Sequence, residues 1–202
     1  MGEVLTVNAT GADEVETVWQ RFIPSARLEH VDPRRVRFRW SSIETGAFSL
    51  VQYSLRADVR SSIHLDDQIM ACQLVALEAR VTTDGRDLAP RQPWLTGDGA
   101  LRAHWNGTGR IRAFLFDRTS AERVARAVSG EDRLVLRAID PVARDRALAA
   151  QWERSFGYVA SALAVGHDQP LVAAELERHA LMSTLTAFST TYLEALDRAA
   201  QY

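Results

Sequence analysis

Alternating side chains predict a series of short β-strands in the middle of the chain. Every second position from 73 to 81 belongs to one face of an extended segment: Gln73, Val75, Leu77, Ala79 and Val81. Turn residues follow at short intervals, at 83–85, 90–93 and 97–99. Strands this short favour a small closed barrel or jelly roll, whose interior can hold a ligand.

A β-hairpin is the clearest single pairing that the pattern predicts. Apolar residues alternate on both sides of an Asn-Gly pair: Leu101, Ala103 and Trp105 before it, and Ile111, Ala113 and Leu115 after Gly109. Asn-Gly suits the tight turns of two-residue hairpins. We therefore expect two strands joined by a turn at Asn106-Gly107.

Positions 34–41 show the same period of two, with arginine facing one side and apolar residues the other. Arginines 35, 37 and 39 alternate with Val36, Phe38 and Trp40, which is typical of a half-buried strand. Arginines on one face of a strand could recognise an acidic ligand or partner, although such rows usually meet water. Gly46 should turn the chain into two further strands, at 47–55 and 58–64.

Helical spacing appears at both ends of the chain. Positions 13–22 predict a short helix that covers the barrel, ended by Pro24. Near the other end, Pro141 should open a long helix with one continuous apolar stripe: Leu148, Trp152, Phe156, Val159 and Leu163. A second helix from Pro170 would complete an antiparallel hairpin. The stripe is either a dimer interface or ordinary intramolecular core.

The predicted fold class is therefore α+β and mainly β, with a small barrel or jelly roll followed by an antiparallel helical hairpin. Its predicted organisation has three parts. Residues 1–140 form the barrel with its N-terminal helix, residues 141–190 form the hairpin, and residues 191–202 begin a further element, which the family resemblance given below implies is a linker. A chain of 202 residues with 47% apolar content supports one substantial core with a helical appendage.

Charge and cysteine content narrow the function classes. The net charge is −2 and the pI is about 6.2, whereas domains built to grip phosphates are usually clearly basic, so we expect no nucleic-acid contact by this segment itself. All 24 basic residues are arginine. The single cysteine, Cys72, excludes an intrachain disulfide and fits a reducing compartment. Because no early apolar run resembles a signal peptide or membrane span, we predict a cytoplasmic protein without membrane contact.

Candidate catalytic and metal-binding groups are sparse. His64, Asp66 and Asp67 could meet His104 across a barrel, but that set is irregular, and polar residues at strand ends explain it more simply. The sequence has no Gly-x-Ser-x-Gly elbow and no Gly-rich phosphate loop with lysine. We therefore predict no metal, no cofactor and no enzymatic activity.

Aromatic residues on or beside the predicted strands are more informative, because ligand pockets are mostly apolar with a few polar groups that fix orientation. Each of these aromatic residues could also be plain core. The predicted ligand-binding residues are Phe38, Trp40, Tyr53, Gln73, Trp94, His104, Trp105 and Phe114. For residues 111–116, parity cannot separate the barrel interior from the outer face, since both faces are apolar.

The order of these elements resembles the N-terminal effector-binding domain of AraC-type transcription regulators. The resemblance rests on several segments: the helix at 13–22, the strand with Gln73-Leu74-Val75 running to Gly85-Arg86, Pro90-x-x-Pro93 with Leu95, the 101–105 strand with 110–118, and the helix at 171–178. Together they cover nearly the whole chain. Only the strand around His104 and Trp105 aligns well enough to carry over a binding role.

This resemblance implies a cupin-like barrel that senses a small molecule, helices that pair two subunits, and a linker to C-terminal helix-turn-helix units that are absent from this sequence. The expected function is a homodimeric, effector-sensing regulatory domain that contacts DNA only through that further domain. A cupin-type enzyme, either an isomerase or a metal dioxygenase, is the alternative if His64, Asp66 and His104 converge. A pure interaction module with a solid barrel is the third possibility.

Overall fold

A computed structural model describes residues 2–32, 36–83, 85–89, 91–96 and 99–201. Parts of the predicted turns at 83–85, 90–93 and 97–99, as well as Arg34, Arg35 and Tyr202, therefore lie outside the described residues. The elements in chain order are β1 (Glu3–Ala9), α1 (Ala12–Phe22), β2 (Arg27–Val31), β3 (Arg37–Thr45), β4 (Phe48–His64), β5 (Gln68–Val75), β6 (Glu78–Thr83), β7 (Arg86–Leu88), β8 (Trp94–Leu95), β9 (Ala100–Asp117), α2 (Arg118–Ser129), β10 (Ala138–Ala143), α3 (Arg146–Gly166), α4 (Pro170–Ala187), β11 (Phe188–Thr190) and α5 (Thr191–Ala199).

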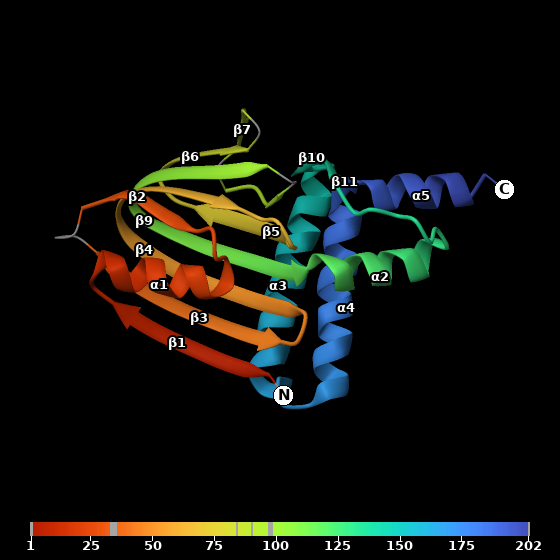
Figure 1. Ribbon diagram of the computed structural model, residues 1–202, viewed down its shortest axis with the longest axis horizontal. Helices are drawn as coiled ribbons and strands as arrows, with labels where there is room; N and C mark the ends of the chain where they lie inside the picture. The colour runs from red at the N-terminus through yellow and green to blue at the C-terminus, as the bar shows by residue number, and fades with distance from the viewer. Residues whose placement is uncertain (1, 33–35, 84, 90, 97–98, 202) are drawn as a thin grey trace.

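Two long strands, β4 and β9, organise the β part of the fold. They pair antiparallel along their whole length, from Phe48 opposite Phe116 to His64 opposite Ala100. At one end of this pair, β3 pairs with β4 and is followed in the sheet by β1, while β5 pairs with β9. The other end pairs with β2 and with β6, which carries β7. Two half-sheets thus share β4 and β9 and curve around a common interior (Figure 1). The cupin-like, mainly β fold predicted from the sequence is confirmed.

The predicted hairpin at Asn106-Gly107 is wrong. Residues 100–117 form one uninterrupted strand that pairs with β4 without a register shift. Gly107 has a φ of +83°, which bends the strand where the half-sheets diverge. At Gly109 a Cβ atom would lie 2.6 Å from Trp105 Nε1, so the missing side chain gives the indole its space. The positive-φ glycine therefore marks a bend rather than a turn.

Three other predicted boundaries also differ. Positions 47–55 and 58–64 belong to the single strand β4, and the alternation from 73 to 81 crosses a break between β5 and β6 at Ala76-Leu77. Pro141 lies inside β10, and α3 starts five residues later, where Asp145 Oδ1 accepts a hydrogen bond from Leu148 N at 2.8 Å. Sequence patterns located these elements but not their limits.

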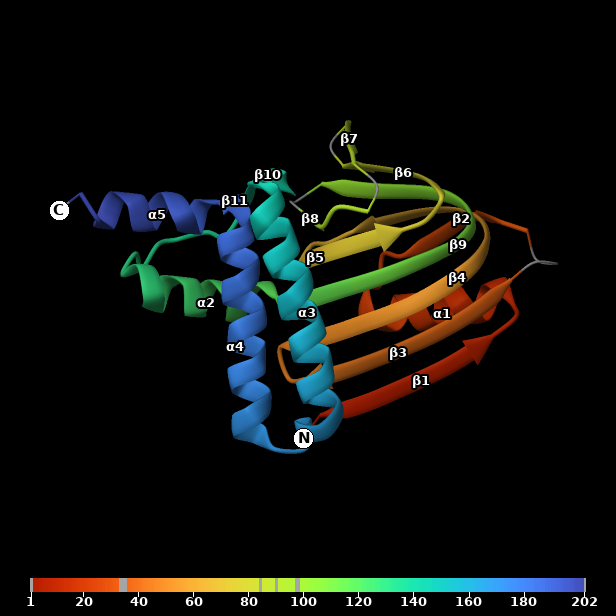
Figure 2. The ribbon, with the colours of Figure 1, turned by 180° about the vertical axis from the view of Figure 1, so that it is seen from behind.

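Helices cover the molecule on two sides. Helix α1 lies across the barrel and buries Val15, Trp19 and Phe22, as the sequence predicted for a covering helix (Figure 1). Helices α3 and α4 run antiparallel on the opposite side, where α4 also contacts β3 (Figure 2). Helices α2 and α5 extend beyond them. Within the described residues, no helix is both long and apolar enough to cross a membrane.

Candidate functional site

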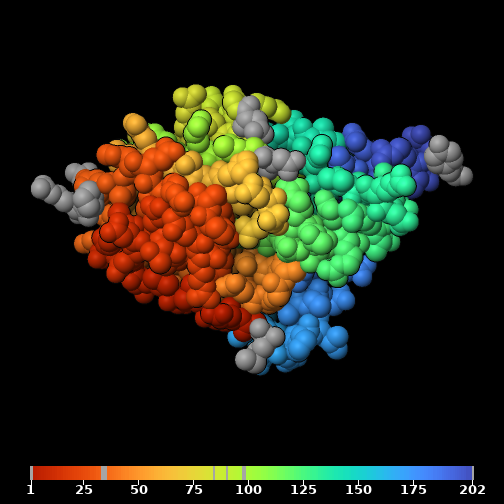
Figure 3. Space-filling model, in the orientation of Figure 1, coloured from red at the N-terminus to blue at the C-terminus, as the bar shows by residue number. Residues whose placement is uncertain are grey.

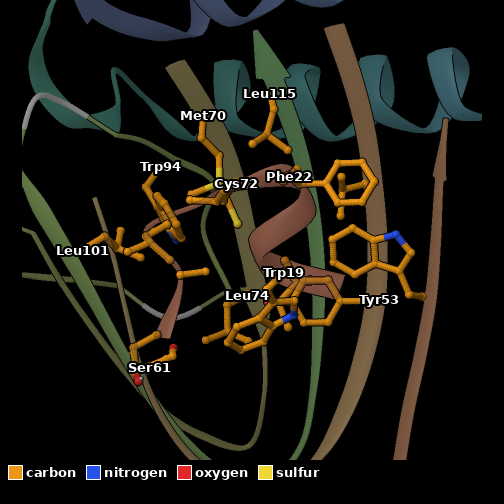
Figure 4. A pocket seen from close by; sticks show the side chains of 18 of the residues that line it. Trp19, Phe22, Tyr53, Ser61, Met70, Cys72, Leu74, Trp94, Leu101 and Leu115 are labelled. Carbon is orange, nitrogen blue, oxygen red and sulfur yellow. Dashed lines mark hydrogen bonds between the residues drawn. The ribbon is translucent and has the colours of Figure 1, made fainter. Parts of the chain in front are cut away.

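An apolar cavity of about 70 Å³ lies inside the barrel beneath helix α1. Side chains from α1, β3, β4, β5, β8 and β9 surround it (Figure 4). In the space-filling view, the N-terminal segment lies over this part of the barrel (Figure 3). The lining comprises Trp19, Phe22, Ile23, Ala26, Trp40, Val51, Tyr53, Ser61, Ile63, Met70, Cys72, Leu74, Trp94, Leu101, Ala103, Trp105, Ile111, Ala113 and Leu115.

Strand parity determines which residues reach the cavity. In β4 and β9 only odd-numbered residues line it, because neighbouring side chains alternate between the two faces of a strand. In β5 the lining residues are the even-numbered Met70, Cys72 and Leu74. This pattern agrees with the register, in which Cys72 lies opposite Ala113. The interior face is therefore continuous across three strands.

Aromatic rings form one wall of the cavity. Trp40 and Tyr53 are stacked, with ring centroids 5.2 Å apart and planes 17° apart. Trp19 of α1 contacts Tyr53 at 5.6 Å, and Phe22 contacts Trp40 at 4.8 Å. The covering helix therefore holds its place through the same rings that line the cavity. A ligand that displaced those rings would also displace α1.

The cavity is electrically neutral, since no carboxylate, guanidinium or imidazole is among its lining side chains. Its polar groups include the Tyr53 hydroxyl, the Cys72 thiol and the Ser61 hydroxyl, which donates to the Ala103 carbonyl at 3.5 Å. Burial raises the pKa of Tyr53 well above its usual value, and the nearby Cys72 adds to the effect. Burial also raises the pKa of the Cys72 thiol. Both groups are therefore neutral at physiological pH, and the cavity suits an uncharged, largely apolar molecule.

Of the predicted binding residues, the structure brings four to the cavity: Trp40, Tyr53, Trp94 and Trp105. Phe38 lies behind this wall, buried and in ring contact with Trp40 and Tyr53 at 5.9 and 5.7 Å. Whether any of these residues binds a ligand stays a prediction.

Three other predicted residues do not line the cavity. Gln73 points to the helix side, where its Nε2 donates to Glu153 Oε1 at 3.0 Å and to the Arg91 carbonyl at 2.6 Å. Phe114 packs on the same side, with Trp152 and Phe156 at 5.4 and 4.8 Å. His104 is on the outer surface, 3.1 Å from Asp58. Each has the opposite parity to its cavity-lining neighbours, and parity alone gave no way to choose the inner face for Phe114.

Sequence reasoning missed several cavity residues. Trp19 and Phe22 were recognised only as the buried stripe of a covering helix, and Met70, Cys72 and Leu74 were assigned no role. From Met70 onward the even positions of β5 are all apolar, which was the signal that could have found them. The odd parity that begins at Gln73 obscured it, because that alternation runs across the break into β6.

His64, Asp66 and His104, which a metal site would have to bring together, do not converge. His64 Nε2 lies 2.9 Å from Asp66, whereas His104 is paired with Asp58 four register positions away on the outer face. Across the described part of the chain, no group of three or more histidine, cysteine, aspartate or glutamate side chains is placed to hold a metal ion. His64 and Asp66 instead border an open cleft of about 500 Å³ that shares Phe22 and Leu115 with the cavity.

The apolar stripe on α3 belongs to the intramolecular core, the alternative that the sequence left open. Trp152, Phe156, Val159 and Leu163 are buried against the sheet and α4, and Leu148 is partly buried. Trp152 Nε1 also donates to Thr184 Oγ1 of α4 at 3.2 Å. These four side chains are covered within one chain, and the prediction that the stripe, with Leu148, forms a dimer interface stays a prediction.

No protein-family model matches the chain, and no curated protein matches it by sequence. Among solved structures, the AraC-like transcriptional activator CuxR is similar with a TM-score of 0.61 at 10% identity, over 92% of this chain and 69% of that one. The cupin domain of Schizosaccharomyces pombe Cnp3 gives a TM-score of 0.35 at 12% identity, over 47% of this chain and 73% of that one, too low to carry an argument. The chain therefore has a cupin-like fold that an AraC-like transcriptional activator shares.

Proposed function

We propose that this chain is the small-molecule-sensing domain of an AraC-type transcription regulator and that its barrel cavity is the effector site. The observation that carries the proposal is the neutral, aromatic cavity closed by α1, in a fold shared with an AraC-like activator. The predicted division into barrel, hairpin and linker stays part of this proposal. So do the cytoplasmic location, the absence of catalysis and the control of a separate DNA-binding domain.

The chemistry of the cavity favours an uncharged effector. A charged molecule would lose its hydration with no partner charge in the lining, at a cost of several kcal/mol. At about 70 Å³ the cavity is smaller than the roughly 300–1,000 Å³ of most drug-sized ligand sites. The effector is therefore small, or it enters as side chains move. Met70 is the flexible member of the wall and the one best suited to adjust.

Binding of an effector in the cavity would affect the helices through strands that contact both. In β9, Ala113 and Leu115 line the cavity while Phe114 between them packs on α3, so a shift of this strand moves both sides together. A second route runs through Trp94, which lines the cavity and pairs through its backbone with Val142 of β10. Strand β10 in turn pairs with β11, which leads directly into α5.

A second copy of the chain would pack on the outer side of the helical hairpin, and not on the buried stripe. Apolar side chains of the two helices are exposed, including Tyr158, Val165 and Leu171, which are 59%, 83% and 84% exposed. The family resemblance also implies pairing through helices. Replacing Val165 and Leu171 with arginine should convert a dimer to a monomer in sedimentation experiments. Leu77→Arg, at a 91% exposed site in the β5–β6 turn, is the matched control and should leave the dimer intact.

Ligand binding can be tested by a thermal-shift screen of small, uncharged aromatic molecules, with calorimetry on the hits. A ligand at a hundredfold excess over its Kd stabilises the fold by about 2.7 kcal/mol. Ala113→Leu, which fills the cavity, should abolish that stabilisation, whereas His104→Ala on the outer face should leave it unchanged. Equal loss in both variants, or hits that are exclusively charged, would contradict the proposed site.

A further inference from the structure

The outer face of the half-sheet that β1, β3 and β5 form with one end of β4 and β9 concentrates positive charge on a protein whose net charge is −2. Five exposed arginines occupy it, and we name this set the arginine face: Arg37 and Arg39 of β3, Arg56 of β4, and Arg110 and Arg112 of β9. Their strand neighbours of opposite parity, such as Phe38 and Ile111, are buried inside. The arginines therefore all point away from the barrel.

Register places these arginines close together. Arg37 lies directly opposite Arg56, and Ser54 separates Arg39 from Arg110 across the three strands. With strands about 4.8 Å apart and residues about 3.4 Å apart along each strand, the five Cα atoms span roughly 10 by 14 Å. Like charges placed directly opposite each other destabilise a sheet. An anion bound between them would relieve that repulsion.

No carboxylate in the described part of the chain pairs with these arginines. Among the described residues, none of the five arginines has a carboxylate within ion-pair distance, whereas Arg21, Arg80 and Arg126 on other surfaces each have one. Asp58, on the same strand face, is paired with His104 instead. Helices α3 and α4 cover only the adjoining end of these strands, so the arginine face is open beside α3 (Figure 2).

The residues between the arginines indicate what kind of anion fits. Ser41, Gln52, Ser54 and Thr108 fill the intervening positions, and none is aromatic or aliphatic. Protein interfaces depend on apolar or aromatic anchors at their centre, and single-stranded nucleic acids stack on exposed aromatic rings. The arginine face offers neither. Arginine with serine, threonine and glutamine is instead the set that contacts the phosphates of duplex DNA.

We propose that the arginine face binds the phosphate backbone of duplex DNA without reading its sequence. A duplex presents about eight phosphate charges over 14 Å of its axis, enough to engage all five guanidinium groups. A sheet surface of this kind inserts no helix or strand into a groove, so the contact positions the protein on DNA and leaves base recognition to other elements. This contact departs from the prediction based on net charge, which averages over a segregated surface.

The test is fluorescence anisotropy of a labelled duplex of about 20 base pairs, titrated with the chain at several salt concentrations. Full engagement of five phosphates gives a slope of log K against log salt near −4.5. The triple variant Arg39→Gln, Arg56→Gln, Arg110→Gln should weaken binding at least tenfold at low salt and reduce the slope by about 2.7. Circular dichroism and thermal unfolding establish that the variant is folded.

The matched control removes the same charge elsewhere, as Arg133→Gln, Arg146→Gln, Arg178→Gln at exposed positions off the sheet. It should bind DNA as the unaltered chain does. Equal weakening in both triple variants would overturn the proposal, because net charge and not the arginine face would then explain binding. So would the absence of binding at low salt, or displacement of the duplex by poly-glutamate at equal charge concentration. The single variant Arg56→Gln, with an expected slope change of about 0.9, repeats the test with less perturbation.

Discussion

Two aromatic clusters lie back to back across strands β4, β5 and β9, and one is solid where the other is hollow. On the helix side, Phe48, Phe114 and Phe116 interlock with Trp152 and Phe156 at centroid distances from 4.8 to 6.0 Å. On the barrel side, the aromatic wall around Tyr53 borders the cavity. Similar residue types thus build a closed core on one face of a sheet and a chamber on the other. The difference comes from the opposing layer.

That layer is a pair of long helices on one side and a curved half-sheet with a short helix on the other. Helices α3 and α4 present large side chains that fill the gaps between strand residues. The barrel interior is enclosed by the two curved half-sheets. Small residues such as Ala103 and Ala113 form part of its wall. The chamber is therefore a product of curvature and small side chains together.

The largest expected effect comes from breaking the solid cluster. Trp152→Ala should lower the free energy of unfolding by about 3–5 kcal/mol, since it removes a fully buried indole that contacts Phe114 and Phe156. Urea denaturation measures the loss. Gln151→Ala, exposed on the same helix, should change stability by no more than about 0.5 kcal/mol. A loss below 1 kcal/mol for Trp152→Ala would show that the helices pack loosely on the sheet.

A smaller effect is expected at the bend that shapes the chamber. Gly109→Ala places a Cβ atom 2.6 Å from Trp105 Nε1, and that nitrogen donates to the Leu55 carbonyl at 3.3 Å. The indole must shift, so we expect a loss of about 1–3 kcal/mol in thermal or urea unfolding. Thr108→Ala, on the exposed face beside it, provides the reference. Equal stability of the two variants would mean that Trp105 has room to move.

The sharpest comparison uses two alanines on opposite faces. Ala71 lies in the solid cluster, and Ala113 lines the cavity. Ala71→Val should destabilise the fold by about 1–3 kcal/mol through overpacking, whereas Ala113→Val should cost less than 1 kcal/mol or stabilise, because it fills empty space. Chemical denaturation of both variants decides it. Equal losses would indicate that the chamber is as tightly packed as the helix side.

The smallest expected effect is on how stability depends on pH, which tests whether water is excluded from the cavity. Burial raises the pKa of Cys72 in the folded state, while an unfolded thiol ionises near pH 8.5. The contribution of the protonated Cys72 thiol to the stability of the fold is therefore fully present below about pH 8.5. Above it, the unfolded state releases the proton first and stability falls by up to about 1.4 kcal/mol per pH unit. Cys72→Ala should show a shallower fall between about pH 7.5 and 9.5 in urea unfolding; parallel curves would mean that water reaches the thiol.

The sequence predicted the fold class and one wall of the chamber because those features depend on local patterns. The alternation of polar and apolar residues in β3 predicted that Phe38 and Trp40 face the barrel interior. The apolar stripe of α1 predicted a covering helix. The sequence also identified Trp94 and Trp105, whose large apolar side chains lie beside turn residues or a strand bend.

The errors share one physical cause, which is that neighbouring elements decide what a local pattern means. Asn106-Gly107 suits a hairpin turn, but the partner strand β4 continues past it, and the glycine bends the strand instead. Phe114 and the α3 stripe were assigned to different partners, although they cover each other. A single sequence gives the two faces of β9 but not the layer that each face meets.

Strands β4 and β9 pass through both half-sheets without interruption. The cavity therefore cannot open by separation of the two half-sheets. Any widening of the cavity must instead change the twist of these two continuous strands. The last residue of β9, Asp117, is also the cap of α2, where its Oδ1 accepts a hydrogen bond from Ser120 N at 2.8 Å. A change in the twist of β9 would therefore also move α2, which contacts α5.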